Sequence, residues 1–242
     1  MFREAKSIAR HCLFEKVVLV GLWEKGLKKE ETLYPGVELV RIPTITSKLG
    51  KNRIVRVAVM IEWQIRIFSR YIRENVLLIT PRNLASLPVG VGFKLVKKCK
   101  LLYETQEMET HRVGWPKFLR YTAKIIEIIL IKNADMVFTV NDYIGDWYRR
   151  EYALRNLQVI ESYPELRVIK KTHVEPLKKA FNIKKDEILF LYQGIIGEGR
   201  GIEILLEVFS QINKHIHVVF MGFGSLEKLV KEYEKINTNI HF

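Results

Sequence analysis

Short apolar runs alternate with longer amphipathic segments along the whole chain, and this alternation restricts the possible folds more than any other feature. The predicted strands are residues 17–22, 37–42, 76–79, 101–103, 136–140, 157–160, 188–192 and 216–221, and the predicted helices are residues 2–13, 53–73, 89–98, 117–132, 144–152, 201–212 and 225–236. Strands that alternate with helices pair in parallel and carry helices on both faces of the sheet. The pattern therefore predicts an α/β fold with parallel sheets.

Charge and composition divide the chain into two regions. The net charge is +13, yet from Ile183 onward seven basic residues face eight acidic ones, so the whole excess precedes Ile183. Pro164, Pro176 and several lysines indicate a linker between the regions. We expect a first domain over residues 1–163, a linker over 164–182 and the start of a second domain over 183–242, each with partners of its own.

Several classes of protein are disfavoured by composition. A hydrophobic fraction of 48% is too high for a disordered chain, and two cysteines, Cys12 and Cys99, cannot build a disulfide framework. The apolar run at 17–23 is too short to span a bilayer, and the run at 125–131 carries Glu127 and is interpreted as a buried helix. We expect no metal site, because no CxxC or HExxH motif occurs and no carboxylate lies near His215 and His217 in sequence.

Two glycine-bearing segments follow consecutive predicted strands in the second region. The first contains Gly194, Arg200 and Gly201, and the second contains Gly222 and Gly224. Loops after parallel strands lie on one edge of a sheet, where such sheets bind ligands, and a helix N-terminus there favours a phosphate or diphosphate. Tight turns alone would also explain the glycines, so a nucleotide-phosphate site and a purely structural role both remain open.

The predicted strand at 101–103 is followed by an acidic loop. Gln106 and Glu107 lie in it, with Glu104, Glu109 and His111 nearby. Carboxylates at the carboxyl end of a strand could position a hydroxyl-bearing acceptor or act as a base. A solvated acidic loop without a chemical role is the alternative.

Basic residues concentrate between Arg41 and Arg73. Within the predicted helix, Arg56, Arg66, Arg70 and Arg73 fall within roughly 100° of one another on a helical wheel. Such a basic stripe beside apolar residues would attract an anionic membrane surface or nucleic acid. A solvated helix face is the third interpretation.

These motifs together resemble the family 4 glycosyltransferases. The segment from Tyr192 to Phe209 is similar to the opening of that family's donor domain, and Gly222 to Leu226 is similar to its second glycine turn. Residues 134–141 and 159–164 resemble the end of its N-terminal domain and the crossover between its domains, and residues 3–9 resemble its first helix. The resemblance is collinear over nearly the whole chain.

The resemblance implies a GT-B fold of two Rossmann-like domains and sugar transfer from a nucleotide-diphosphate donor with retention at the anomeric carbon. It assigns the diphosphate contact to Arg200, gives Gly194, Gly201, Gly222 and Gly224 to the donor pocket, and makes Gln106 and Glu107 acceptor-side candidates. It further implies that no metal cofactor is needed and that the acceptor is a cell-envelope or lipid-linked glycan. It implies a cytoplasmic location at the inner face of the plasma membrane, with Arg56, Arg66, Arg70 and Arg73 toward the membrane. Nucleic acid is not an expected partner.

The chain departs from the family pattern at Ile195, where many members carry a basic residue, and at Gln106, where many carry histidine. It opens on a predicted helix, stops within what resembles a third strand of the second domain, and contains no Glu-x7-Glu motif near its end. We therefore expect an incomplete second domain, truncation at both ends, and weak or no turnover by this polypeptide alone. A non-catalytic basic protein that binds anionic membrane or nucleic acid is the alternative function.

Overall fold

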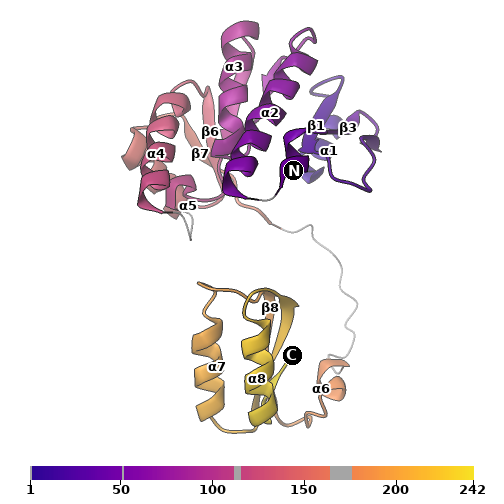
Figure 1. Ribbon diagram of the computed structural model, residues 1–242, viewed down its shortest axis with the longest axis vertical. Coiled ribbons are helices and arrows are strands. Elements are labelled where there is room, and N and C mark those ends of the chain that lie inside the picture. Colours follow the sequence, from indigo (N-terminus) through magenta and orange to yellow (C-terminus); the bar gives the residue numbers. More distant parts are fainter. Residues whose placement is uncertain (1, 51, 112–115, 164–175) are drawn as a thin grey trace. The chain divides into compact units, whose positions relative to one another are not determined.

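The computed structural model describes residues 2–50, 52–111, 116–163 and 176–242. The chain divides into two compact units, Met1–Tyr163 and Pro164–Phe242, and no sheet of the described residues is shared between them (Figure 1). The first unit contains α1 (Phe2–Arg10), β1 (Val17–Leu22), β2 (Glu30–Tyr34), β3 (Val37–Ile42), η1 (Thr46–Leu49), α2 (Arg53–Tyr71), β4 (Leu78–Ile79), η2 (Leu84–Ser86), α3 (Leu87–Lys97), β5 (Lys100–Glu104), η3 (Glu109–His111), α4 (Lys117–Ile131), β6 (Met136–Thr139), α5 (Asp142–Tyr152) and β7 (Leu157–Val159).

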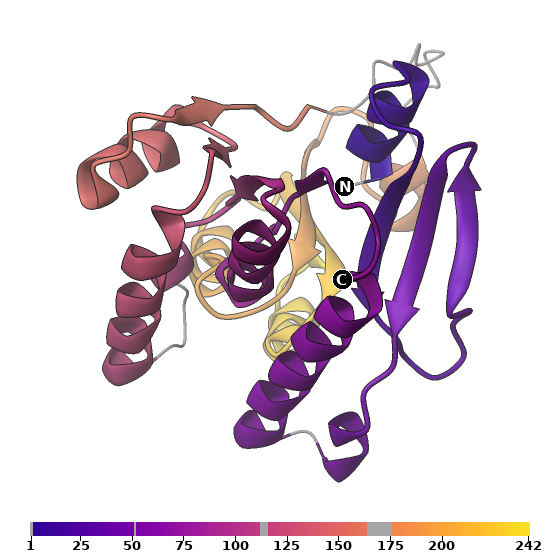
Figure 2. The ribbon, with the colours of Figure 1, turned by 90° about the horizontal axis from the view of Figure 1, so that it is seen from above.

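The strands of the first unit form a three-stranded sheet in the order β1-β3-β2 and a four-stranded sheet in the order β4-β5-β6-β7. All pairs in the four-stranded sheet are parallel, as is the β1–β3 pair. Strand β2 is antiparallel to β3, and Figure 2 shows it at the outer side of β3. Strand β2 was not among the predicted strands, because its charged residues obscure the apolar pattern of an edge strand.

Helices α2, α3 and α4 lie side by side, with α3 in the middle (Figure 1). The Asn52 side chain caps α2 by accepting a hydrogen bond of 2.8 Å from the Val55 N–H. Phe93 of α3 packs in one buried cluster with Val40, Ile42 and Ile67, while Leu87 of the same helix belongs to a second cluster. Helix α3 therefore contributes side chains to both hydrophobic cores of the unit. The burial of each such side chain adds about 1.5–3 kcal/mol to the free energy of unfolding.

The second unit contains α6 (Pro176–Ala180), β8 (Ile188–Ile195), α7 (Ile202–Gln211), β9 (Ile216–Phe223), α8 (Glu227–Ile236) and β10 (Ile240–His241). Its three strands are parallel in the order β10-β9-β8. Fully buried Ile196, Ile202, Leu206 and Val230 form the centre of its core. The predicted α/β architecture with parallel sheets is thus confirmed.

Some boundaries differ from those expected. Residues 164–175 of the predicted linker lie outside the described residues, and the remainder includes the short helix α6. Helix α2 ends at Tyr71, so Arg73 lies in the turn that follows it. In the part of the chain that the structure describes, no helix combines the length and apolar character that crossing a membrane requires.

Candidate functional site

The first glycine segment forms the connection between β8 and α7. Gly201 is the N-cap of α7 and adopts a left-handed conformation with φ of +73°, which favours glycine. A glycine cap has no side chain with which to satisfy the first N–H groups of the helix. Ile196 and Ile202 are fully buried on either side of the loop and hold it in place. The helix thus presents uncapped donors and the positive end of its dipole at this edge.

Arg200 lies directly before this helix and is exposed. Within the described residues, no ion pair involving its guanidinium is seen, although Glu198 and Glu203 are close in sequence. A guanidinium beside uncapped N–H groups is suited to an anion with several oxygens, such as a diphosphate. The assignment of Gly194, Arg200 and Gly201 to a donor remains a prediction.

The second glycine turn packs against the first through backbone contacts. The Ile196 N–H donates to the Phe223 carbonyl at 2.9 Å, and the Leu226 N–H donates to the Ile196 carbonyl at 3.0 Å. A Cβ at Gly222 would lie 1.8 Å from the Gly194 carbonyl oxygen, and one at Gly224 would lie 2.2 Å from that of Ile196. Close approach of the two turns therefore explains these glycines without any ligand.

Glu227 occupies the N-terminus of α8. Its Oε1 accepts a hydrogen bond of 3.0 Å from the Gly224 N–H. The Leu226 N-cap supplies no side-chain hydrogen bond, and Glu227 supplies the side-chain acceptor at this end of the helix. Because a carboxylate already occupies this N–H, the open donors of the site belong to the first loop, and Gly222 and Gly224 shape the edge.

In the first unit, Gln106 and Glu107 lie exposed in the loop after β5. The Gln106 amide donates to Glu104 Oε1 at 3.0 Å, and Glu104 also pairs with Arg82. The Glu107 carbonyl accepts a 2.7 Å hydrogen bond from the Thr105 hydroxyl. Glu109 is buried, so the acidic cluster expected from the sequence is divided between surface and interior.

Below this loop lies a buried carboxylate, Glu127 of α4. Its Oε1 accepts hydrogen bonds of 2.9 Å from the hydroxyls of Tyr103 and Tyr148, and its Oε2 accepts one of 2.6 Å from Tyr152. Tyr148 also contacts the loop, 3.0 Å from the Thr105 hydroxyl. Burial raises the pKa of Glu127 despite these hydrogen bonds, which lower it. The network anchors the loop that carries Gln106 and Glu107.

Helix α4 is buried on one face only. The sequence predicts a buried helix over 125–131, and Glu127 and Ile131 are buried, but Ile125, Ile126 and Ile129 are exposed. The physical reason is that three tyrosine hydroxyls need an acceptor inside the unit. A charged residue within an apolar helical run was the sequence signal that could have revealed this network.

The four arginines predicted to face a membrane do not form one free stripe. Arg66 Nε donates to Glu62 at 2.7 Å, and Arg70 Nη2 donates to Glu30 at 2.6 Å. Arg56 is exposed on α2, and Arg73 is exposed beyond the end of the helix. The partner of Arg70 was not evident from the sequence because Glu30 is 40 residues away along the chain, whereas Glu62 lies one helical turn before Arg66.

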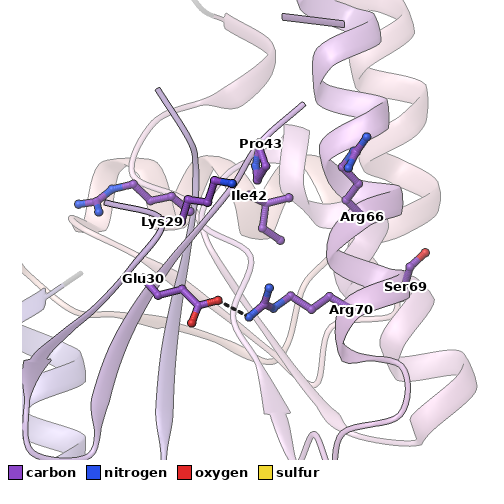
Figure 3. Close-up of a pocket in the computed structure, with 8 residues that line it drawn as sticks. Lys29, Glu30, Ile42, Pro43, Arg66, Ser69 and Arg70 are labelled. Atoms are coloured by element: carbon purple, nitrogen blue, oxygen red, sulfur yellow. Dashed lines mark hydrogen bonds and ion pairs between the residues drawn. The ribbon is translucent and has the colours of Figure 1, made fainter. Parts of the chain in front are cut away.

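Arg66 and Arg70 instead line a pocket of about 520 Å³ beside the end of β3 (Figure 3). Its walls are formed by Lys29, Glu30, Arg41, Ile42, Pro43, Arg66, Ser69 and Arg70. In Figure 3, Arg70 points across the pocket toward Glu30. Each of the Arg66 and Arg70 ion pairs uses one of the five N–H groups of a guanidinium. The other N–H groups of these guanidinium ions are of a kind that donates to anions, and no sequence motif predicted this pocket.

The histidines of the second unit are not isolated, contrary to the sequence interpretation. Glu187 lies 3.1 Å from His215 and 3.4 Å from His217, and His217 Nδ1 lies 3.0 Å from His241 Nε2. The sequence placed Glu187 far from both histidines, but the start of β8 pairs with the start of β9. Among the described residues, no group of three or more side chains has the arrangement of a metal site.

We expect this histidine cluster to make the second unit less stable in acid. Burial lowers the pKa of His241 from its ordinary 6.5, because the folded unit favours the neutral imidazole. The contribution of His241 to the free energy of unfolding is therefore lost as the pH falls below 6.5. A hydrogen bond from the Lys184 N–H lowers the pKa of Glu187 from its ordinary 4.5. Protonation of Glu187 therefore removes further stability as the pH falls below 4.5. Amide exchange of β8 and β9 at pH 7.5 and 5.5 should show smaller protection factors at pH 5.5, where each rate is divided by the intrinsic amide rate at that pH. The His241→Phe variant should reduce the difference; equal protection of the wild type at both pH values would contradict the expectation.

A scan against models of protein families finds no match, and no curated protein matches the chain. Solved structures do match. A sucrose-phosphate synthase from Thermosynechococcus elongatus has a TM-score of 0.77 at 17% identity, over 96% of this chain and 61% of that one. HepE from Anabaena, in complex with UDP and glucose, has a TM-score of 0.57 at 13% identity, over 82% of this chain and 51% of HepE.

A glycosyltransferase from Rickettsia africae has a TM-score of 0.55 at 13% identity, over 97% of this chain and 59% of that one. The chain thus spans between half and two thirds of the length of these three proteins. At these identities the likeness shows the fold: the chain has the α/β fold with parallel sheets found in GT-B glycosyltransferases.

Proposed function

We propose that this chain belongs to a glycosyltransferase that moves a sugar from a nucleotide-diphosphate donor to a cell-envelope or lipid-linked glycan. The observation that carries the proposal is the uncapped N-terminus of α7 beside Arg200, at the carboxyl edge of a parallel sheet in a GT-B fold. HepE forms complexes with UDP and with UDP-glucose. Membership of family 4 and retention at the anomeric carbon rest on the sequence resemblance.

The proposed donor chemistry is electrostatic. In transfer, negative charge gathers on the departing diphosphate, and donors held in place beforehand stabilise that charge. The N–H groups at the start of α7 and the Arg200 guanidinium would supply these donors, with Gly194, Gly222 and Gly224 shaping the pocket. The proposal requires no metal ion, because these protein groups neutralise the diphosphate.

On the acceptor side, Gln106 and Glu107 are proposed to contact the acceptor glycan. Both are exposed in a loop that the buried Glu127 network anchors. We propose a cytoplasmic location at the inner face of the plasma membrane, where lipid-linked acceptors occur. The excess of positive charge before Ile183 supports that location.

Replacing Arg200 by alanine should weaken nucleotide diphosphate binding at least about tenfold. The loss of a charge-assisted hydrogen bond costs about 1.5–3 kcal/mol, and tenfold corresponds to about 1.4 kcal/mol. Calorimetric titration with UDP and GDP measures the affinity, and hydrogen exchange should show protection of residues 192–201. Binding is the appropriate readout because we expect weak or no turnover from this polypeptide alone.

Lys235→Ala is the matched control, because Lys235 is an exposed cation in the last turn of α8. This variant should bind UDP as the wild type does, and EDTA should leave the affinity unchanged. Equal affinities of Arg200→Ala and Lys235→Ala would remove Arg200 from the site. Salt-sensitive binding of nucleic acid with no response to UDP or GDP would favour the alternative, a non-catalytic basic binding protein.

A further inference from the structure

The outer face of α2 carries a stripe of large apolar side chains. Ile54, Val57, Ile61 and Ile65 are 81%, 55%, 54% and 59% exposed. At 100° per residue they fall within about 80° of one another, so they form one continuous line along the helix. Scattered apolar residues are normal on a surface, but an exposed row along a helix of this length indicates an interaction site.

The apolar stripe continues beyond the start of α2. Leu49 and Ile45, in and before η1, are 71% and 66% exposed, and η1 contacts α2. A shallow groove along the stripe is lined by Ala58, Ile61, Glu62, Ile65 and Arg66. The apolar surface therefore extends from η1 along three turns of the helix.

Glu62 does not give this surface a free negative charge. Its carboxylate accepts 2.8 Å hydrogen bonds from the N–H groups of Ile45 and Thr46, and it also pairs with Arg66. The Ile45 hydrogen bond is the main reason that its pKa is lowered to about 2. The carboxylate is thus neutralised by groups of the unit itself.

Positive charge lies along one side of the stripe. Arg66 lies about 100° and Arg70 about 140° further round the helix than Ile65. Each guanidinium gives one N–H group to Glu62 or Glu30 and keeps its others. Arg66 borders both the apolar groove and the basic pocket that also contains Lys29 and Arg41 (Figure 3). A surface with an apolar stripe and an adjoining basic flank matches the boundary between acyl chains and anionic headgroups.

We propose that this face of the first unit docks onto an anionic phospholipid bilayer. The side chains of Ile54, Val57, Ile61 and Ile65 enter the boundary between headgroups and acyl chains, and the basic pocket lies at the level of the lipid phosphates. Charge complementarity argues for a bilayer, because the whole positive excess of the chain precedes Ile183. The inference deepens the proposed membrane location and rests on the proposed function in that respect.

The experiment is co-sedimentation of the purified chain with vesicles of phosphatidylcholine alone or with one third phosphatidylglycerol. The wild type should bind the anionic vesicles, and the double variant Ile61→Ser/Ile65→Ser should bind them about tenfold more weakly, because two apolar anchors are lost. Ile204→Ser is the matched control, since Ile204 is 67% exposed on α7. Arg66→Gln/Arg70→Gln should reduce the preference for anionic over neutral vesicles.

Two results would overturn the proposal. One is equal vesicle binding by the wild type and the double serine variant. The other is a wild-type dimer in light scattering that the double variant breaks, since the stripe would then be an interface between two copies. UDP titration without vesicles is run in parallel, so a failure of membrane docking is distinguishable from a failure of the donor site.

Discussion

Replacing Glu127 by leucine should destabilise the first unit by about 3–5 kcal/mol. The substitution leaves the hydroxyls of Tyr103, Tyr148 and Tyr152 without their shared acceptor in a buried site. Each unsatisfied buried hydroxyl costs about 1–3 kcal/mol, and losses of this size exceed those of most single substitutions. Urea unfolding followed by tryptophan fluorescence measures the effect, because all four tryptophans precede Tyr163 and Trp147 contacts Tyr148 and Tyr152.

Glu127→Gln separates loss of the acceptor from loss of the charge. Burial already disfavours the charged carboxylate, as its raised pKa indicates, and glutamine keeps one oxygen acceptor. We expect Glu127→Gln to lower the free energy of unfolding by about 1–2 kcal/mol, which is less than the effect of Glu127→Leu. Glu151→Gln is the control: Glu151 pairs with Lys124 at the surface, and such pairs contribute about 0–1 kcal/mol. A leucine variant as stable as this control would show that the tyrosines find other partners.

The same variants test the role of the network in holding the acceptor loop. Tyr148 lies between Glu127 and the loop, 3.0 Å from the Thr105 hydroxyl. In a folded Glu127→Gln variant, we expect faster amide exchange of residues 105–111 and unchanged amide exchange of β8 and β9. Acceptor-side residues on a loop can thus depend on a carboxylate in a neighbouring helix.

Local sequence pattern predicted the strands better than the side-chain partners. The runs that became β1, β8 and β9 were recognisable as largely apolar stretches, and the run that became β3 by its alternation of apolar and charged residues. Strand β2 was not, because an edge strand tolerates charged residues, and Glu30 and Glu31 obscure its apolar pattern. Propensity and periodicity describe neighbours along the chain, whereas edge pairing depends on a partner strand.

In the candidate site as well, local patterns were predictable from the sequence, and contacts between distant segments were not. Helical periodicity placed Arg66 and Arg70 on one face of a helix, and the Arg66–Glu62 pair follows from i,i+4 spacing within α2. The Arg70–Glu30 pair and the pocket between β3 and α2 are tertiary. The periodicity of 125–131 likewise could not show which face of α4 is buried, because that depends on the tyrosines of β5 and α5. Glycine positions at strand ends were predictable, since strand, glycine and helix are consecutive in sequence.

The second large effect is expected from Gly222→Ala. The new Cβ would lie 1.8 Å from the Gly194 carbonyl oxygen, and backbone cannot move aside as a flexible side chain can. The φ of +157° adds strain for any residue with a Cβ. Separating the turns after β8 and β9 would break the Ile196–Phe223 hydrogen bond. We expect the free energy of unfolding of the second unit to fall by more than about 3 kcal/mol, which is enough to unfold a unit of this size.

The readout must distinguish the two units, and the distribution of tryptophan makes that possible. Because no tryptophan follows Tyr163, the fluorescence transition should be unchanged in Gly222→Ala, while amide protection of β8, β9 and α7 and protection by UDP should be lost. Gly197→Ala is the control in the same region, because its Cβ would meet Ile195 and Ser225 at 3.5 and 3.6 Å, ordinary contact distances. If Gly222→Ala kept protection like that of Gly197→Ala, close approach of the turns could not be the reason for glycine, and a direct ligand contact would become the better explanation.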